Sequence, residues 1–289
     1  MSELSVVVEE IARGLSAGQV IPYLGPEVLA LDPANAAVPA TPEALVQQLT
    51  AKVSVPHKIR NNLTAAAQFI ENFKHRKSAV KLMSEAFQTP ATATDLHHYL
   101  AGLTKLPLVV DVWYDNAMAS ALQDRDNWGC IQGLSQAEHF GTWTKNYLPD
   151  GAEVEDALIE GWNTVLYQPL GAIEPARNFL VSDSDYVEVL TEIDIQTPIP
   201  AVVQQRRTDR NFLFLGCRFA NQLERSFARQ TMKRSSHKHW AVLPEEPTKN
   251  EKRFMAEQDI QRLDIPLEEF VRALMRASSE AGKLLAVNA

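Results

Sequence analysis

Short apolar runs alternate with segments that carry apolar residues at helical spacing. Residues 20–24, "VIPYL", form such a run and are closed by Gly25, and residues 106–112 and 211–215 repeat the pattern of an apolar run followed by a turn. Uninterrupted runs of this length are typical of strands buried on both faces of a parallel sheet. Because helical segments separate the runs, the pattern predicts an α/β, Rossmann-like fold with a largely parallel sheet flanked by helices.

Two segments interrupt this alternation. Residues 42–104 have a helical pattern throughout, and Thr41 followed by Pro42 is typical of an N-cap with proline in the first turn. Residues 121–165 are rich in aromatic and polar residues and lack a regular period. We therefore interpret residues 1–289 as one domain with a helical insertion lobe at about 42–104 and an irregular, aromatic-rich insertion at about 121–165.

The charge and hydropathy of the chain restrict its partners. The 289 residues have a net charge of -8, whereas nucleic acid and anionic lipid require concentrated positive charge. The basic segment "MKRSSHKHW" is open to two interpretations, an anion-binding patch or the solvated end of a helix. No stretch reaches about 18 uninterrupted apolar residues, and the first residues lack the pattern of a signal peptide. We expect a cytoplasmic protein with no membrane span and no nucleic-acid partner.

Metal-ligand spacing is missing from the sequence. The only cysteines, Cys130 and Cys217, are far apart, which excludes a disulfide framework and a four-cysteine zinc site. His237 and His239 are two residues apart and would need a third ligand to hold a metal, so we interpret them as an exposed strand start. The sequence predicts no zinc.

The order of four segments resembles the sirtuin-like domains of bacterial proteins, including those of phage defence. The segments are "GQVIPYLGPEV", "DLHHYLAGLTKLPLVVDVWYDNAMASAL", "YQPLGAIEPARNFLVSDSDYVEVL" and "NFLFLGCRFANQLER". Nearly the whole chain is covered by this resemblance. The framework positions that match are Gly25, Tyr114, Asp115, Gly171, Tyr186 and Gly216. The resemblance implies a fold that binds NAD or ADP-ribose and, in active members, NAD hydrolase or NAD-dependent deacylase activity.

The first turn departs from the family pattern. Members of the family carry Gly-Ala-Gly-x-Ser after the first strand, and this chain carries Gly25 followed by Pro26 and Glu27. Pro26 has no N–H to offer a phosphate, and Glu27 places a carboxylate where the pyrophosphate would lie. Two like charges about 4 Å apart repel by roughly 1 kcal/mol in water and by more in a cleft. The alternative is that the turn only connects two elements, with Glu27 favourably placed at a helix N-terminus.

Three further positions of the resemblance also differ. The asparagine of the family corresponds to Trp113, which lacks the paired donor and acceptor of an amide. The catalytic histidine of the family corresponds to Leu170, which cannot accept a proton. The aspartate that follows the Leu-Phe-x-Gly strand of the family corresponds to Asn221. The chain therefore matches the family at the framework positions and differs from it at the positions that carry the family's chemistry.

Other side chains could replace the missing ones. Asp111, Asp115 and His139 are the candidates for catalysis, although Asp115 equally fits a cap of the following helix. Cys217 follows a strand at a turn, where a nucleophile or a small buried residue would both fit.

Three hypotheses follow. The favoured one is a pseudoenzyme, a non-catalytic regulatory or binding module of sirtuin-like fold. The second is an active NAD-dependent enzyme that uses non-standard residues. The third is a scaffold or homo-oligomer whose insertions bind a protein partner. The residues expected at a nucleotide site are Gly25, Pro26, Glu27, Trp113, Tyr114, Asp115, Gly171, Gly216, Cys217 and Asn221.

Overall fold

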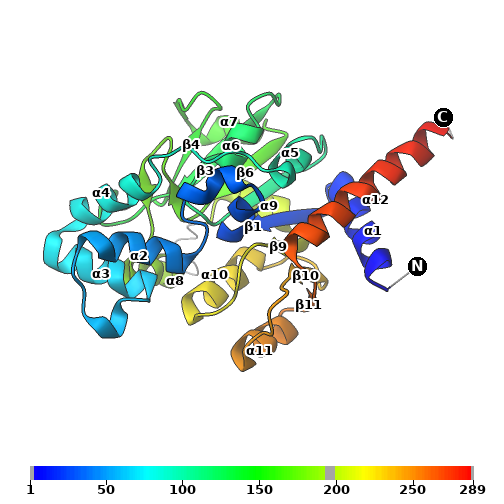
Figure 1. The fold of residues 1–289 in the computed structure, drawn as a ribbon. Coiled ribbons are helices and arrows are strands. Elements are labelled where there is room, and N and C mark those ends of the chain that lie inside the picture. Colours follow the sequence, from blue (N-terminus) through cyan, green and yellow to red (C-terminus); the bar gives the residue numbers. More distant parts are fainter. Residues whose placement is uncertain (1–2, 193–198, 288–289) are drawn as a thin grey trace.

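A computed structural model describes residues 3–192 and 199–287, which form an α/β fold around one large sheet (Figure 1). Within these residues the sheet has nine strands in the order β11-β10-β9-β1-β2-β6-β3-β4-β5. Its strands are β1 (Val20–Leu24), β2 (Leu108–Asp111), β3 (Trp128–Gly133), β4 (Thr144–Tyr147), β5 (Glu153–Val154), β6 (Thr164–Gln168), β9 (Asn211–Leu215), β10 (His239–Val242) and β11 (Ile260–Leu263). A separate hairpin pairs β7 (Gly171–Ala172) with β8 (Asn178–Phe179).

The sheet is parallel from β11 to β3, and next to β3 the strand β4 pairs antiparallel with both β3 and the edge strand β5. Strand β1 lies in the middle, where Tyr23 pairs with Val110 of β2 on one side and with Phe214 of β9 on the other. In chain order, β2 is placed on one side of β1, and β9 is placed later on the other side. The topology therefore switches at β1, and the predicted Rossmann-like fold class is confirmed.

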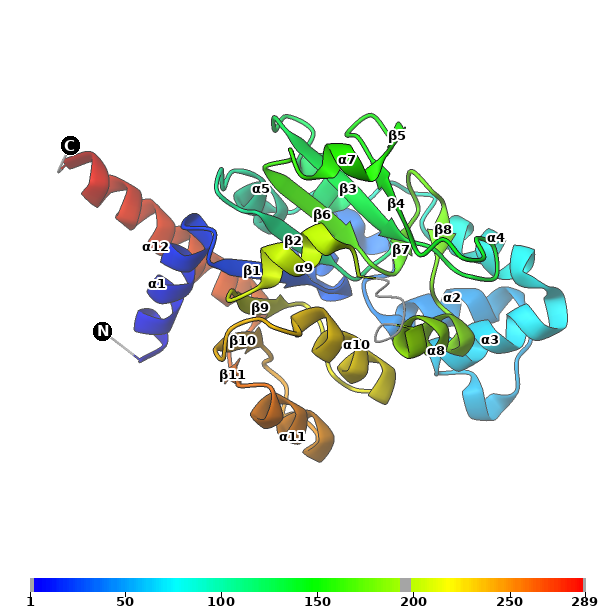
Figure 2. The same cartoon turned by 180° about the vertical axis from the view of Figure 1, so that it is seen from behind.

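Helices cover both faces of the sheet because the side chains of each strand alternate between them. Val20 and Leu24 pack with α1 (Glu3–Ser16), α5 (Asp95–Ala101), α6 (Ala117–Ala121) and α12 (Leu267–Val287). Ile21 and Tyr23 pack on the opposite face. That face carries α9 (Ala201–Arg207), α10 (Gln222–Met232) and α11 (Lys249–Glu257), of which α9 and α10 are visible in Figure 2.

Three helices form a lobe at the end of the molecule opposite to α1 and α12 (Figures 1 and 2). They are α2 (Pro42–Lys52), α3 (Leu63–Lys74) and α4 (Arg76–Ala86), and α8 (Asp183–Glu192) packs against α3. The hydroxyl of Thr41 accepts a hydrogen bond from the Ala44 N–H at 3.0 Å, which confirms the expected N-cap of α2. Residues 42–104 contain α2, α3, α4 and α5, of which α5 packs on the sheet and not in the lobe.

The irregular insertion expected at residues 121–165 is wrong. This segment supplies β3, β4, β5 and α7 (Asp156–Ile159), and β3 pairs with β6 inside the main sheet. Two features conceal β3 in the sequence. Its glycines interrupt the apolar run, and Gly129 is required because a Cβ there would lie 2.3 Å from the Trp162 ring. Gln132 is polar but buried, and its amide donates to Gln168 Oε1 at 2.8 Å.

The described residues also contain the 3-10 helices η1 (Pro26–Leu31), η2 (Pro33–Ala37) and η3 (His57–Ile59). The alternative interpretation of the first turn placed Glu27 at a helix N-terminus, and Glu27 lies in the first turn of η1. The other two were not predicted. Among the described residues, no helix is long and apolar enough to cross a membrane.

Candidate functional site

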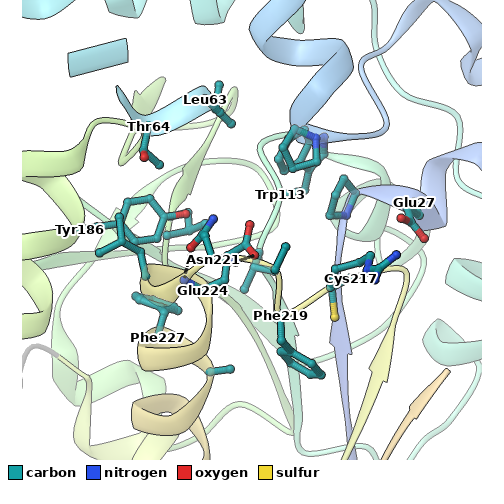
Figure 3. Close-up of a pocket in the computed structure, with 18 of the residues that line it drawn as sticks. Glu27, Leu63, Thr64, Trp113, Tyr186, Cys217, Phe219, Asn221, Glu224 and Phe227 are labelled. Atoms are coloured by element: carbon teal, nitrogen blue, oxygen red, sulfur yellow. Dashed lines mark hydrogen bonds between the residues drawn. The ribbon is translucent and has the colours of Figure 1, made fainter. Parts of the chain in front are cut away.

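A cavity of about 290 Å³ lies at the carboxyl ends of β1, β2 and β9 (Figure 3). Its floor comes from the turns that follow these strands, and α10 forms one wall. Residues of the lobe complete it, from the start of α2, the segment that leads into α3, and α8. The cavity thus occupies the topological switch point, where the ligands of open parallel sheets bind.

The backbone N–H groups of the turn after β1 donate hydrogen bonds to other groups of the protein. The Gly25 N–H donates to Leu215 O at 2.8 Å, and the Glu27 N–H donates to Gly216 O at 3.0 Å. The Val28 N–H donates to Gly25 O at 3.3 Å, and Pro26 has no N–H. No backbone N–H of residues 25–28 is therefore left for a ligand.

Gly25 and Gly216 are required by the packing of two turns against each other. A Cβ on Gly25 would lie 2.3 Å from the Cβ of Cys217 and 2.4 Å from Gly216 O. Gly216 has a φ of +65°, and a Cβ there would lie 2.6 Å from Val28 N. Gly25 and Gly216, two of the three glycines that match the sirtuin pattern, are thus required by packing within the protein, without any ligand.

Glu27 lies half-buried at the cavity, in the first turn of η1. Burial raises the pKa of its carboxyl group, and the nearby Arg218 guanidinium opposes that rise. Arg218 is itself engaged, because its Nε lies 3.2 Å from Glu251 Oε1 and its Nη1 pairs with Glu245. The guanidinium is therefore shared among several carboxylates before any ligand arrives.

The Trp113 side chain, which the resemblance aligns with the family asparagine, is held in place by the surrounding protein. Its indole N–H donates to Pro39 O at 2.8 Å, and only 4% of the residue is exposed. The ring packs against Tyr114 at 5.0 Å and edge-on against Phe87 at 6.0 Å between centroids. Because an indole has one donor, Trp113 offers the cavity a surface and no hydrogen bond.

Leu170 and Asn221 also line the cavity. Leu170 is buried and contributes an apolar surface where the family has its histidine. The Asn221 side-chain oxygen accepts from the Glu224 N–H at 2.8 Å, and Glu224 Oε2 accepts in return from the Asn221 N–H at 3.3 Å. Asn221 is therefore the N-cap of α10, in a capping box.

The three candidates for catalysis lie outside the lining of the cavity as the described residues define it. Asp115 Oδ1 accepts from the Ala117 N–H at 2.7 Å, so Asp115 caps the start of α6. Asp111 Oδ1 accepts from the Trp113 N–H at 3.3 Å. Both carboxyl groups are buried, which raises the pKa of Asp111 well above its ordinary range and that of Asp115 to about 6. His139 lies partly exposed after β3.

The buried carboxyl of Asp111 predicts a pH dependence of stability. Its pKa in the folded protein lies above the ordinary 3.8, so folding takes up a proton and stability decreases as the pH rises from about 4. Asp111→Asn retains the Oδ1 acceptor and removes this decrease. We expect the variant to gain melting temperature over the wild type progressively from pH 4 to pH 7. Parallel melting curves across this range would contradict the expectation, and the exposed Asp126→Asn is the control.

Most of the remaining predicted residues line the cavity, and Gly171 lies elsewhere in the fold. Tyr114, Cys217 and Tyr186 line the cavity, and burial raises the pKa of the Cys217 thiol well above its ordinary range. Gly171 instead lies in β7, where a φ of +75° and the approach of Asn178 O require glycine. Cys217 is thus placed at the cavity as a buried, protonated thiol.

The histidines before and in β10 differ in exposure. His237 is exposed, whereas His239 is buried and its Nδ1 accepts from the Phe212 N–H at 2.9 Å. The interpretation of both as an exposed strand start is therefore wrong for His239, because this side chain satisfies a backbone donor of β9. Within the described residues, no group of three His, Cys, Asp or Glu side chains is arranged to hold a metal ion.

Several residues of the cavity were missed by sequence reasoning. Tyr23 lies inside β1, where the strand pattern indicates only burial, and Glu43 and Thr64 come from the lobe, which the sequence does not place near the sheet. Arg218 and Phe219 follow Cys217 in the turn after β9. Their position after the last glycine turn was the signal that could have identified them.

The sequence and the structure were compared with known proteins. A family model described as "SIR2-like domain" matches residues 107–263. A solved structure described as "Structural Basis for the Mechanism and Regulation of Sir2 Enzymes" has 10% sequence identity and a TM-score of 0.47, and the similarity covers 96% of this chain and 98% of the other. A search of curated proteins found no match. Because the family model matches more than half of the 289 residues, the chain belongs to the SIR2-like domain family.

Proposed function

We propose that the chain is a SIR2-like ligand-binding module that does not cleave NAD. The SIR2-like fold is associated with NAD binding, and the cavity lies where that fold places its ligand. The observation that carries the proposal is the turn after β1. A pyrophosphate is normally held by free backbone N–H groups, and here those of Gly25, Glu27 and Val28 are all donated within the protein.

The lining of the cavity supports the absence of cleavage. Leu170 occupies the place where the resemblance puts a general base, and a leucine side chain cannot take up a proton. The indole N–H of Trp113 is donated to Pro39 O and is not free to orient a ribose or a water molecule. Asp111 and Asp115, the candidates for a replacement base, accept backbone hydrogen bonds outside the lining. Binding without chemistry is the function that this set of side chains supports best.

The position of the cavity suits a regulatory role. Glu43 and Leu63 line it from the lobe, while Phe219 and Glu224 line it from the side of the sheet. A ligand that contacts both parts would favour the arrangement in which they are close together. Binding at this site would therefore change the population of lobe positions, which a partner protein could detect.

Incubation with NAD tests the proposal. We expect the purified protein to release no nicotinamide beyond that in protein-free NAD, as measured by chromatography. Protein-dependent release would contradict the proposal. Three variants would then identify the alternative chemistry. Asp111→Asn and Asp115→Asn each remove a candidate base while they retain the Oδ1 acceptor, and His139→Gln removes the third candidate outside the cavity.

A further inference from the structure

We propose that the cavity binds an organic cation that has a flat aromatic body and carries no phosphate. This inference rests on the proposed function of the same cavity and adds the chemical class of its ligand. Three properties of the cavity carry it: the sign of its charge, its aromatic lining and one tyrosine hydroxyl group to which no described residue is hydrogen-bonded.

Acidic side chains outnumber basic ones around the cavity. Glu27, Glu43 and Glu224 line it, and Arg218 is the one basic residue in the lining that the described residues provide. Arg218 already pairs with Glu251 and Glu245, so its charge is largely compensated. A ligand phosphate would meet these carboxylates, and the turn at residues 25–28 would offer it no free backbone N–H. A cationic ligand would instead be attracted to them.

Several aromatic residues are part of the lining. Tyr23, Trp113, Tyr114, Phe219 and Phe227 are all buried residues that line the cavity. In Figure 3, the Trp113 and Phe227 rings lie on opposite sides of the cavity, with Glu224 between them. Ring faces attract flat ring systems and cations, and the attraction increases when both are removed from water.

One polar group of the cavity lacks a partner. Tyr23 is 5% exposed and lines the cavity, and its hydroxyl has no hydrogen bond to any residue that the structure describes. Burial raises the pKa of this hydroxyl well above its ordinary range, so it stays protonated. Because Tyr23 lines the cavity, its hydroxyl can exchange a hydrogen bond with a polar atom of a ligand. Tyr23 therefore points to a ligand with a hydroxyl, carbonyl or N–H group beside its ring.

The size of the cavity sets an upper limit for the ligand. About 290 Å³ lies at the lower end of the range of small-molecule sites. This volume suits one ring system with a small polar substituent and not a dinucleotide. A phosphate-free aromatic cation meets the limits of volume, charge and hydrogen bonding together.

A matched pair of ligands tests the inference by calorimetric titration. Nicotinamide riboside is an aromatic cation without phosphate, and nicotinamide mononucleotide differs from it by one phosphate. Tryptamine, a protonated amine on an indole ring, is the second phosphate-free probe. We expect saturable binding of at least one phosphate-free cation. If the riboside binds, we expect the mononucleotide to bind at least tenfold more weakly.

Two variants complete the test. Glu27→Gln should weaken binding of the cation severalfold. If the riboside binds, the variant should also reduce the difference in affinity between the riboside and the mononucleotide. Glu153→Gln, an exposed carboxylate in β5, should change neither. The inference is overturned if neither cation binds, if the mononucleotide binds as tightly as the riboside, or if Glu27→Gln has no effect. None of these outcomes produces nicotinamide from NAD, so the proposed lack of cleavage stands or fails separately.

Discussion

Gly25→Ala is expected to lower the free energy of unfolding by about 2–3 kcal/mol, because it forces a methyl group between two packed turns. The new Cβ would lie 2.3 Å from the Cβ of Cys217 and 2.4 Å from Gly216 O. Neither atom belongs to a flexible side chain that could move aside. Relief requires β1 and β9 to separate where Gly25 donates to Leu215 O, so the hydrogen bond between the two strands also weakens.

Urea unfolding followed by tryptophan fluorescence measures this effect, and Gly161→Ala is the matched control. A Cβ on Gly161 would make its nearest contact at 3.6 Å, which is ordinary van der Waals distance. We expect the control to change stability by no more than about 0.5 kcal/mol. Equal stability of Gly25→Ala and the wild type would show that the turn has room. Gly25 would then be better explained by the approach of a ligand.

Arg76→Met is expected to be the most damaging of the substitutions considered, at about 3–5 kcal/mol of destabilisation, because it leaves buried carboxylates without their cation. Arg76 Nη1 lies 2.9 Å from Asp185 Oδ2 and 3.3 Å from Glu71 Oε2, and its Nε lies 3.1 Å from Glu138 Oε2. The Asp185 side chain is only 1% exposed. Arg76 also donates to Phe179 O, so one side chain connects the lobe to β8 and α8.

Lys81→Met tests the same chemical change on the surface. Lys81 lies on α4 as well, is 77% exposed and pairs with Glu85 at 3.8 Å. An exposed pair of this kind contributes at most about 1 kcal/mol. Thermal and urea unfolding of the two variants should therefore differ clearly. A loss below about 1 kcal/mol for Arg76→Met would mean that water compensates Asp185 when the guanidinium is removed.

The fold was largely predictable where burial shows in local composition. Strands β1, β2 and β9 are nearly continuous apolar runs, and each was predicted from its residues. Strand β3 was missed because two glycines and the buried Gln132 conceal its pattern. The reasons for these residues lie elsewhere in the chain, in the Trp162 ring and in Gln168, which are brought to β3 only by folding.

The location of the site followed from the predicted topology, since the turns after parallel strands meet at one edge of the sheet. Whether the N–H groups of those turns are free or donated within the protein could not be predicted from the sequence. That the Glu27 N–H donates to Gly216 O depends on pairing between distant parts of the chain. The same holds for Trp113, whose N–H is donated to Pro39. Lobe residues such as Glu43 could be predicted to line the cavity only with knowledge of how the lobe packs beside the sheet.

Release of nicotinamide tests the central claim most directly. Wild-type protein at a concentration comparable to that of NAD should be incubated for many hours, and the products separated by chromatography. We predict a nicotinamide level equal to that of NAD alone, because Leu170 offers no base and the turn at Gly25 offers no free N–H to a pyrophosphate. Release that increases with protein concentration and is lost on heat denaturation would contradict the account.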